Sequence, residues 1–140
     1  SKKNKSTKVF QALRIIVNNE ISELLTGLSK SCNLISKNGK IITVTFHSIE
    51  DRICKSFFNS ISSTNKVSRY LPLNNLSGVS FNVVNRKALT PSSEEIEKNP
   101  PSRSAKLRAV KRIDDNIVDT KFIFEKFKYL LNIENITSRL

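Results

Sequence analysis

The stretch KIITVTFHSIEDR (residues 40–52) decides the fold, because it joins the clearest strand of the sequence to the clearest helix start. KIITVTF is short, β-branched and almost continuously apolar, which is typical of a strand buried on both faces in a parallel sheet covered by helices. Ser48 followed by Asp51 resembles a capping box. Apolar residues then recur at helical spacing, at Ile49, Ile53, Phe57 and Ile61.

Helical spacing also precedes this stretch. Steps of three and four predict one helix over residues 9–34. Its apolar positions are Phe10, Leu13, Val17, Ile21, Leu24 and Leu28. Helix, strand and helix joined by short turns are typical of the α/β class.

The second half of the chain predicts two more strands and two more helices. FNVVNR (residues 81–86) and SAKLRAVKRI (residues 104–113) favour strands, and the second alternates so that Lys106 and Arg108 form a basic outer face. Ser92 with Glu95 predicts a short helix, which Pro100-Pro101 ends. The Ser/Asn-rich residues 62–79 indicate a loop. From Asn116 onward, Phe124, Phe127 and Leu131 lie at helical spacing and predict an amphipathic helix whose phenylalanines pack in the core.

Composition limits the classes of protein. The 140 residues are 38% hydrophobic, enough for one core, and no apolar run approaches the roughly 18 residues of a membrane span. The two cysteines have no ligand spacing, so we expect a reduced, cytoplasmic protein without a zinc site and without a membrane partner. The only three glycines, Gly27, Gly39 and Gly78, lie too far apart to form a GxGxxG motif or a P-loop. Because the sequence contains no methionine, we expect it to be a fragment of something longer.

Positive charge is concentrated in the first part of the chain. Residues 1–113 contain 20 Lys/Arg and 7 Asp/Glu, whereas residues 114–140 contain 4 and 5. This distribution favours a polyanionic partner such as nucleic acid, because neutralised phosphates release counterions. Charge that serves only solubility is the alternative.

Three stretches carry a family resemblance: STKVFQALRIIVNNEI (6–21), GKIITVTFHSIEDRICKSFF (39–58) and RKALTPSSEEIEKNPPSRSAKLRAVKR (86–112). Together with the spacing between them, they resemble the C-terminal portion of the RsmH/MraW family of ribosomal RNA small subunit methyltransferases. Before FQALR the family has His-Pro-Ala-Thr-Arg, of which KKNKSTK keeps only the threonine and the basic residue.

The resemblance implies a fold, a cofactor and a partner. The fold is the C-terminal part of a class I (Rossmann-like) S-adenosylmethionine-dependent methyltransferase. Residues 1–113 correspond to part of that domain, with the first helix leading in from a helical insertion, and residues 114–140 form a tail without a counterpart. The implied activity is N4-methylation of a cytosine in 16S rRNA of the small ribosomal subunit. The family's cofactor-binding residues lie upstream of this chain, which alone is expected to be inactive; a homodimer is left open.

His47 and Ser48 are the candidate catalytic residues. Ligands lie outside the carboxyl ends of strands in such sheets, where a strand ending at Phe46 would present both side chains. His47 could accept the proton that the cytosine amine loses, or could tie strand to helix structurally. Ser48 is either catalytic or a helix N-cap. Glu50 and Asp51 suit the first helical turn.

Four basic residues are the candidate RNA contacts. Lys106 and Arg108 project together from their strand and could follow a phosphate backbone, and Arg103 fits a loop contact. Arg52 could hold a phosphate or pair with a neighbouring carboxylate. The alternative for this group is a solvated strand edge. Two rival functions therefore remain: a non-enzymatic basic RNA-binding module, and an interaction segment built on the tail helix.

Overall fold

The computed structural model describes residues 5–62 and 79–137. The chain divides into two compact units. The sheet unit is Lys30–Val118, and the helical unit combines Ser1–Ser29 with Asp119–Leu140. The loop predicted for residues 62–79 lies almost entirely outside the described residues.

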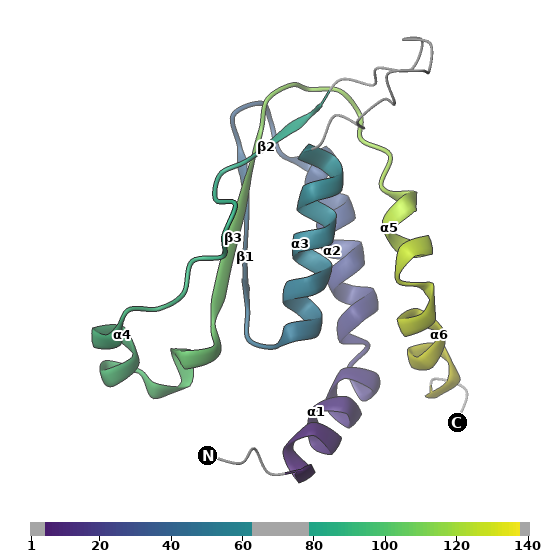
Figure 1. Ribbon diagram of the computed structural model, residues 1–140. Coiled ribbons are helices and arrows are strands. Elements are labelled where there is room, and N and C mark those ends of the chain that lie inside the picture. The colour runs from purple at the N-terminus through teal and green to yellow at the C-terminus, as the bar shows by residue number, and fades with distance from the viewer. Residues whose placement is uncertain (1–4, 63–78, 138–140) are drawn as a thin grey trace, which may run out of the picture. The chain divides into compact units, whose positions relative to one another are not determined.

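A three-stranded sheet organises the sheet unit (Figure 1). Its strands are β1 (Lys40–Thr45), β2 (Phe81–Val83) and β3 (Lys106–Arg112), in the order β1-β3-β2. β3 pairs antiparallel with both neighbours, so β1 and β2 run in the same direction without touching. The parallel pairing expected for β1 is therefore wrong within the described residues, because the strand that reaches β1 is the oppositely directed β3.

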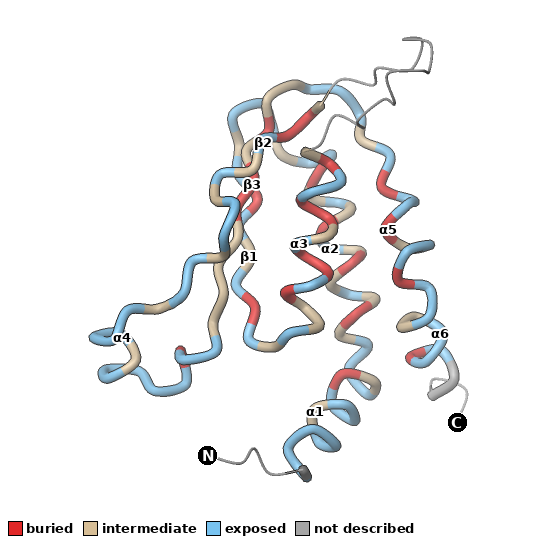
Figure 2. The backbone as a smooth tube through the Cα atoms, in the orientation of Figure 1, coloured by how far each residue is buried: buried red, intermediate tan, exposed pale blue. Residues whose placement is uncertain are grey.

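One helix covers one face of this sheet. α3 (Ser48–Ser62) packs against all three strands, and its buried side chains are Asp51, Ile53, Cys54, Phe57, Phe58 and Ile61. Figure 2 shows these buried positions along α3, together with the alternation of burial along β1. The helical spacing predicted after residue 48 is confirmed. The prediction that both faces of β1 are buried is wrong, since Ile41 and Thr45 are buried whereas Ile42 and Val44 are exposed.

The connection between β2 and β3 contains two short turns of helix. α4 (Ser93–Lys98) is capped as predicted, because Ser92 Oγ accepts a hydrogen bond from the Glu95 N–H at 3.1 Å. Pro100 begins the 3-10 turn η1 (Pro100–Ser104), which leads into β3. A proline near the start of a turn is tolerated because the N–H it lacks would have no helical partner.

The helical unit begins with two helices where one was predicted. α1 (Lys5–Val17) ends before α2 (Glu20–Leu34), because Asn19 adopts φ 51°, a left-handed conformation that asparagine tolerates. Consequently the predicted apolar face is not continuous: Phe10 and Val17 of α1 are exposed, whereas Ile21 of α2 is buried.

The C-terminal residues complete the helical unit. α5 (Lys121–Lys126) and α6 (Lys128–Thr137) form where one tail helix was expected, and Phe127 between them is buried as predicted. The buried carboxylate of Glu134 accepts hydrogen bonds from the N–H groups of Ile21 and Ser22, at 2.8 and 3.0 Å. A carboxylate there satisfies orphan N–H groups and complements the positive end of the α2 dipole.

Arg112, at the end of β3, ties the sheet to its surrounding loops. Its side chain is only 3% exposed, and its guanidinium donates to the carbonyl oxygens of Cys32, Ile35, Asp114 and Asn116. The guanidinium carbon also lies 5.8 Å from the ring centroid of Phe81. A rigid fork of five donors can satisfy several carbonyls at once, including those at the negative end of α2.

We expect Arg112→Met to lower the free energy of unfolding by about 2–4 kcal/mol, because several buried carbonyl oxygens lose their donors together. Urea titration followed by circular dichroism measures the change. Lys111→Met is the matched control, since Lys111 is less buried and neighbours Arg112 on the opposite face of β3. Equal stability of the two variants would contradict the role given to Arg112.

Candidate functional site at the carboxyl end of strand β1

The turn from β1 into α3 is closed by a capping box one residue earlier than predicted. His47, not Ser48, is the N-cap, because its carbonyl oxygen accepts the first helical hydrogen bond, from the Asp51 N–H. His47 Nδ1 accepts from the Glu50 N–H at 3.4 Å. In return Glu50 Oε2 accepts from the N–H groups of Phe46 and His47, at 3.1 and 3.4 Å. This reciprocal pairing is the capping-box pattern, with histidine in the place of serine or threonine.

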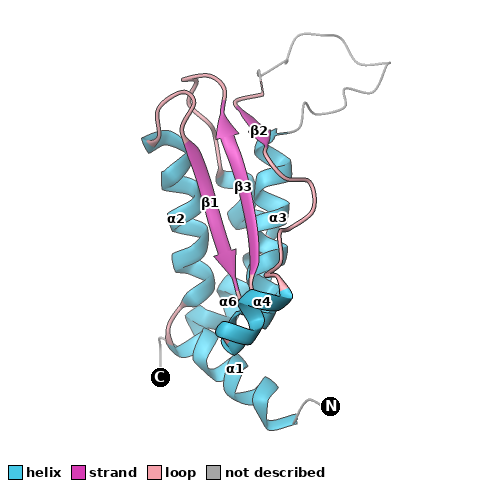
Figure 3. Ribbon diagram, turned by 90° about the vertical axis from the view of Figure 1, so that its left-hand side faces the viewer, coloured by secondary structure: helices cyan, strands magenta, loops and turns pink. Residues whose placement is uncertain are grey.

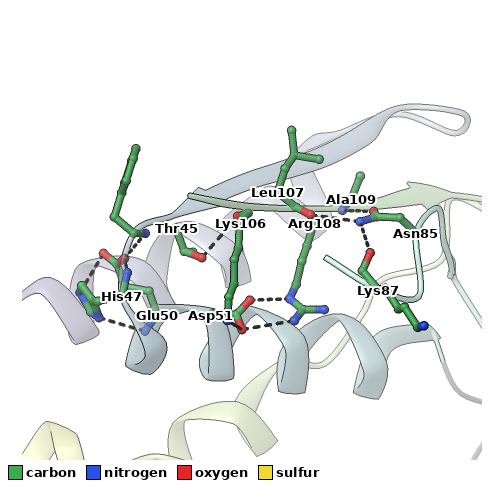
Figure 4. Close-up of polar contacts among 11 residues, drawn as sticks. Thr45, His47, Glu50, Asp51, Asn85, Lys87, Lys106, Leu107, Arg108 and Ala109 are labelled. Carbon is green, nitrogen blue, oxygen red and sulfur yellow. Dashed lines mark hydrogen bonds and ion pairs between the residues drawn. The ribbon is translucent and has the colours of Figure 1, made fainter. Parts of the chain in front are cut away.

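The imidazole of His47 is therefore held on both sides (Figure 4). Its side chain is 8% exposed, and Nε2 lies 3.2 Å from Glu50 Oε1. Nδ1 accepts a backbone hydrogen bond, and the other ring nitrogen, Nε2, faces that carboxylate. The geometry favours the structural interpretation of His47, while Ser48 is exposed at the first position of α3.

Asp51 faces β3 instead of capping α3. Its carboxylate contacts Arg108 Nε at 2.7 Å and Arg108 Nη2 at 3.3 Å, and Lys106 Nζ at 3.2 Å (Figure 4). Burial raises the pKa of the Asp51 carboxyl, but the hydrogen bonds and charges of Arg108 and Lys106 outweigh burial and hold that pKa below its ordinary value. An ionised Asp51 thus joins α3 to β3.

This pairing corrects the predicted basic outer face of β3. Lys106 and Arg108 do project together, but toward α3 (Figure 4). The Arg108 side chain is 11% exposed, whereas that of Lys106 is 43% exposed. Alternation correctly predicted that they share a face; it could not say that a helix covers that face. Of the two, Lys106 is the one with surface left for a phosphate.

The remaining candidate RNA contacts are exposed. Arg52 lies on the solvent side of α3, adjacent in sequence to the buried Asp51, and Arg103 lies in η1. Arg103 Nη1 donates to the carbonyl oxygen of Pro100, at 3.5 Å. Both side chains are positioned on the surface of the sheet unit, as a contact with a polyanion requires.

Asn85 is a positioning residue that the sequence analysis missed. Its side-chain oxygen accepts from the Ala109 N–H at 2.8 Å, and its amide nitrogen donates to the carbonyl oxygens of Leu107 and Lys87, at 3.0 and 2.9 Å. The amide thus continues the pairing of β3 after β2 has ended. An asparagine near the end of the predicted strand 81–86 was the available signal, since its side chain imitates backbone.

Two of the three glycines, Gly27 and Gly39, lie among the described residues. Gly39 is required by its own turn, where an added Cβ would lie 2.9 Å from the Ser36 carbonyl oxygen, and Gly27 lies in α2 with open space beside it. Neither of these two glycines makes a cradle for a ligand. Burial raises the pKa of the free thiols of Cys32 and Cys54 to about 12 and about 11, so neither is a nucleophile near neutral pH.

No helix within residues 5–62 and 79–137 has the length and apolarity needed to cross a membrane.

Comparison with known proteins gives one consistent match. Residues 1–113 match the MraW methylase family. A relative from Ehrlichia chaffeensis is 47% identical over 108 residues, which are 77% of this chain and 34% of the relative. A relative from the Wolbachia of Brugia malayi is 43% identical over 113 residues, which are 81% of this chain and 31% of the relative. A relative from Azorhizobium caulinodans is 43% identical over 109 residues, which are 78% of this chain and 32% of the relative.

These relatives share one name, ribosomal RNA small subunit methyltransferase H. The chain spans about a third of their length. Residues 114–140 lie outside the family match.

We expect His47→Ala to lower the free energy of unfolding by about 1 kcal/mol, as loss of an N-cap does, and His47→Asn to restore most of it. Thermal melts of the chain measure this. Ser48→Ala is the control and should change stability little. In a complete enzyme, His47→Asn with normal stability and lost turnover would instead identify His47 as the proton acceptor.

We expect Asp51 to make the free energy of unfolding decrease as the pH falls into the acid range. Its pKa is lowered by folding, so its contribution is fully present above the unfolded pKa, about 4, and is lost as pH falls through the folded value. Asp51→Asn should cost about 2–3 kcal/mol near pH 7, because the largely buried Arg108 loses its counter-charge, and less at low pH. Urea titrations from pH 2 to 7 test this. A pH-independent cost would contradict it.

Proposed function

Because the chain belongs to the MraW methylase family, we propose that it forms part of an S-adenosylmethionine-dependent rRNA methyltransferase. The proposed reaction is methylation of the N4 amine of a cytosine in 16S rRNA of the small ribosomal subunit. The observation that carries this proposal is the family match over 113 of the 140 residues, with relatives that are 43–47% identical and are named as methyltransferases of ribosomal RNA.

The proposed contribution of this chain is the substrate side of the enzyme and not the cofactor side. Neither of the two described glycines makes a cradle for a ligand, and we propose that the donor is bound by the two-thirds of the family sequence that have no counterpart here. The carboxyl end of β1 then lies near the target base. Ser48 is exposed there, and the locked His47–Glu50 pair fixes the path of the chain from β1 into α3.

The basic surface is the proposed contact with rRNA. Lys106, Arg52 and Arg103 are accessible to phosphates, whereas Arg108 supports them indirectly by holding Asp51, and through it α3, against the sheet. The net charge of +12 adds a sequence-independent attraction to the polyanion. Phosphate contacts position an RNA without reading its sequence, so selection of one cytosine requires further parts of the enzyme.

A non-enzymatic RNA-binding module is the second candidate. It is favoured by one observation: the chain carries a net charge of +12, and sequence-independent attraction to a polyanion needs no cofactor. The two candidates differ in whether the chain supports methyl transfer once the missing two-thirds are supplied.

A covalent chimera tests the proposed function. In it, the full chain replaces the matching segment of the Ehrlichia chaffeensis relative. We expect the chimera to bind S-adenosylmethionine and to methylate cytosine N4 in small subunits that lack the modification, because the catalytic parts are then complete. Mass spectrometry of the rRNA nucleosides detects the product.

The unfused chain is the control and should show no heat of binding with S-adenosylmethionine in calorimetry. A folded, cofactor-binding chimera that methylates no rRNA would contradict the enzymatic proposal. If the unfused chain nevertheless binds rRNA with a steep salt dependence, the RNA-binding module is the better description.

A further inference from the structure

The exposed side of α3 carries a row of polar side chains that begins at the carboxyl end of β1. Ser48, Arg52 and Lys55 follow one another at steps of four and three residues, which places them on one face of the helix. We call these three residues the α3 stripe. All three are exposed. In Figure 3, β1 and β3 lie in front of α3 and cover the helix from one side, so the sheet leaves the stripe accessible.

The positive charge of the α3 stripe is not compensated by an acid. Arg52 and Lys55 have no ion-pair partner within the described parts of the chain. The two acids of α3 are engaged elsewhere, Glu50 in the capping box and Asp51 in its contacts with β3. The stripe therefore offers two full charges to a ligand.

Two exposed lysines on other helices differ from this arrangement. Lys98 contacts Glu94 at 2.6 Å, and Lys128 contacts Glu125 at 3.6 Å. An acid about one turn away is common on a helix face that serves only contact with water. Because the α3 stripe has no such acid, its cations favour an external anion over a purely solvated face.

Two lysines from the sheet side lie next to the α3 stripe or extend toward α3. Lys106 contacts Asp51, one helical turn before Lys55, and its side chain is 43% exposed. Lys87 is exposed in the segment after β2, where the Asn85 amide holds the Lys87 carbonyl oxygen at 2.9 Å. In Figure 4 the Lys87 side chain extends to the α3 side of β3. The basic surface is thus wider than the helix alone.

The length of the α3 stripe suits an extended polyanion. An α-helix rises about 1.5 Å per residue, so Arg52 and Lys55 are about 4.5 Å apart along the axis, and Ser48 and Lys55 about 10 Å. Phosphates along one strand of a nucleic acid helix recur at about 3.4 Å. The two cations can therefore contact different phosphates of the same strand.

We propose that the α3 stripe, with Lys87 and Lys106, is a track for the phosphate backbone of the rRNA strand that leads away from the target nucleotide. Lys55 and Lys87 are then phosphate contacts in addition to Arg52 and Lys106. This inference rests on the proposed function, which puts the target base near the carboxyl end of β1, where the stripe begins at Ser48. From there the strand follows α3 toward its C-terminal end. Such contacts fix the direction of the RNA without reading its sequence.

The test compares two double variants of the full chain that lose the same charge. Arg52→Gln/Lys55→Gln removes both cations of the stripe, and the control Lys37→Gln/Lys40→Gln removes two exposed lysines at the opposite end of β1. Binding to 16S rRNA is measured over a range of salt concentrations. We expect the stripe variant to bind roughly tenfold more weakly, with the slope of log K against log salt reduced by about 1.4, because two phosphate contacts are lost. The control should keep the slope of the unmodified chain.

A third variant, Lys87→Gln, tests the track outside α3 and should reduce the slope by about 0.7. All three variants should melt like the unmodified chain, since the substituted side chains are exposed. An unaltered slope for the stripe variant or for Lys87→Gln would overturn the proposal. Weaker binding of the stripe variant to polyglutamate, without weaker binding to rRNA, would overturn it in favour of an acidic protein.

The outcomes for the track and for the proposed function are separable. If the stripe variant loses salt dependence while the covalent chimera methylates no rRNA, the proposed function is refuted and the track remains as an RNA-binding surface. If the chimera is active and Arg52→Gln/Lys55→Gln leaves its salt dependence unchanged, the track is refuted and the function stands.

Discussion

The basic inner face of β3 is the constraint on which the sheet unit depends. Period-two alternation places Lys106, Arg108 and Arg112 on one face of β3, and the first two point toward α3 (Figure 4), so cations must be accommodated beside an apolar core. A buried charge is tolerated only when it is paired and hydrogen-bonded. Asp51 meets this requirement for Lys106 and Arg108, and four backbone carbonyl groups meet it for Arg112. Together these contacts fix α3, the end of α2 and the residues after β3 around one strand.

This constraint also separates structural from accessible positive charge. The side chains of Arg108 and Arg112 are both engaged inside the sheet unit. Among the four candidate RNA contacts, the charge accessible to a polyanion lies on α3 at Arg52, on η1 at Arg103 and at the exposed part of Lys106. The same division applies to the proposed catalytic pair, since His47 is engaged by Glu50 whereas Ser48 is exposed. A count of ionisable residues in a motif therefore overstates what the motif can offer to a substrate.

Within the described residues, α3 covers one face of the sheet, and the chain matches only part of the length of its relatives. The chain spans about a third of its relatives, and its longest edge strand, β1, is apolar on a face that α3 does not cover. Residues 114–140, outside the family match, provide Glu134 and Phe127 to the helical unit. The tail thus has a structural role of its own, in capping α2 and filling the core beside it.

The sequence by itself determined the elements. Apolar spacing predicted α3, the Ser92–Glu95 cap predicted α4, and alternation predicted β3, because each depends on residues a few positions apart. The motifs of three segments also identified the family, which the match over residues 1–113 confirms. The predicted N-cap of α3 was one residue too late, because His47 is an unusual N-cap residue. The prediction of a single first helix was wrong, because Asn19 adopts a left-handed conformation that apolar spacing does not reveal.

Only the tertiary structure decided which side of each element faces the core. That choice set the inward direction of Arg108 and the exposure of Ile42 and Val44. The antiparallel pairing of β1 with β3 is likewise a long-range contact that local patterns do not show. Alternation assigns residues to two faces but does not distinguish the faces from each other. The distinction comes from long-range contacts such as Asp51 with Arg108, whose partners lie 57 residues apart in the chain.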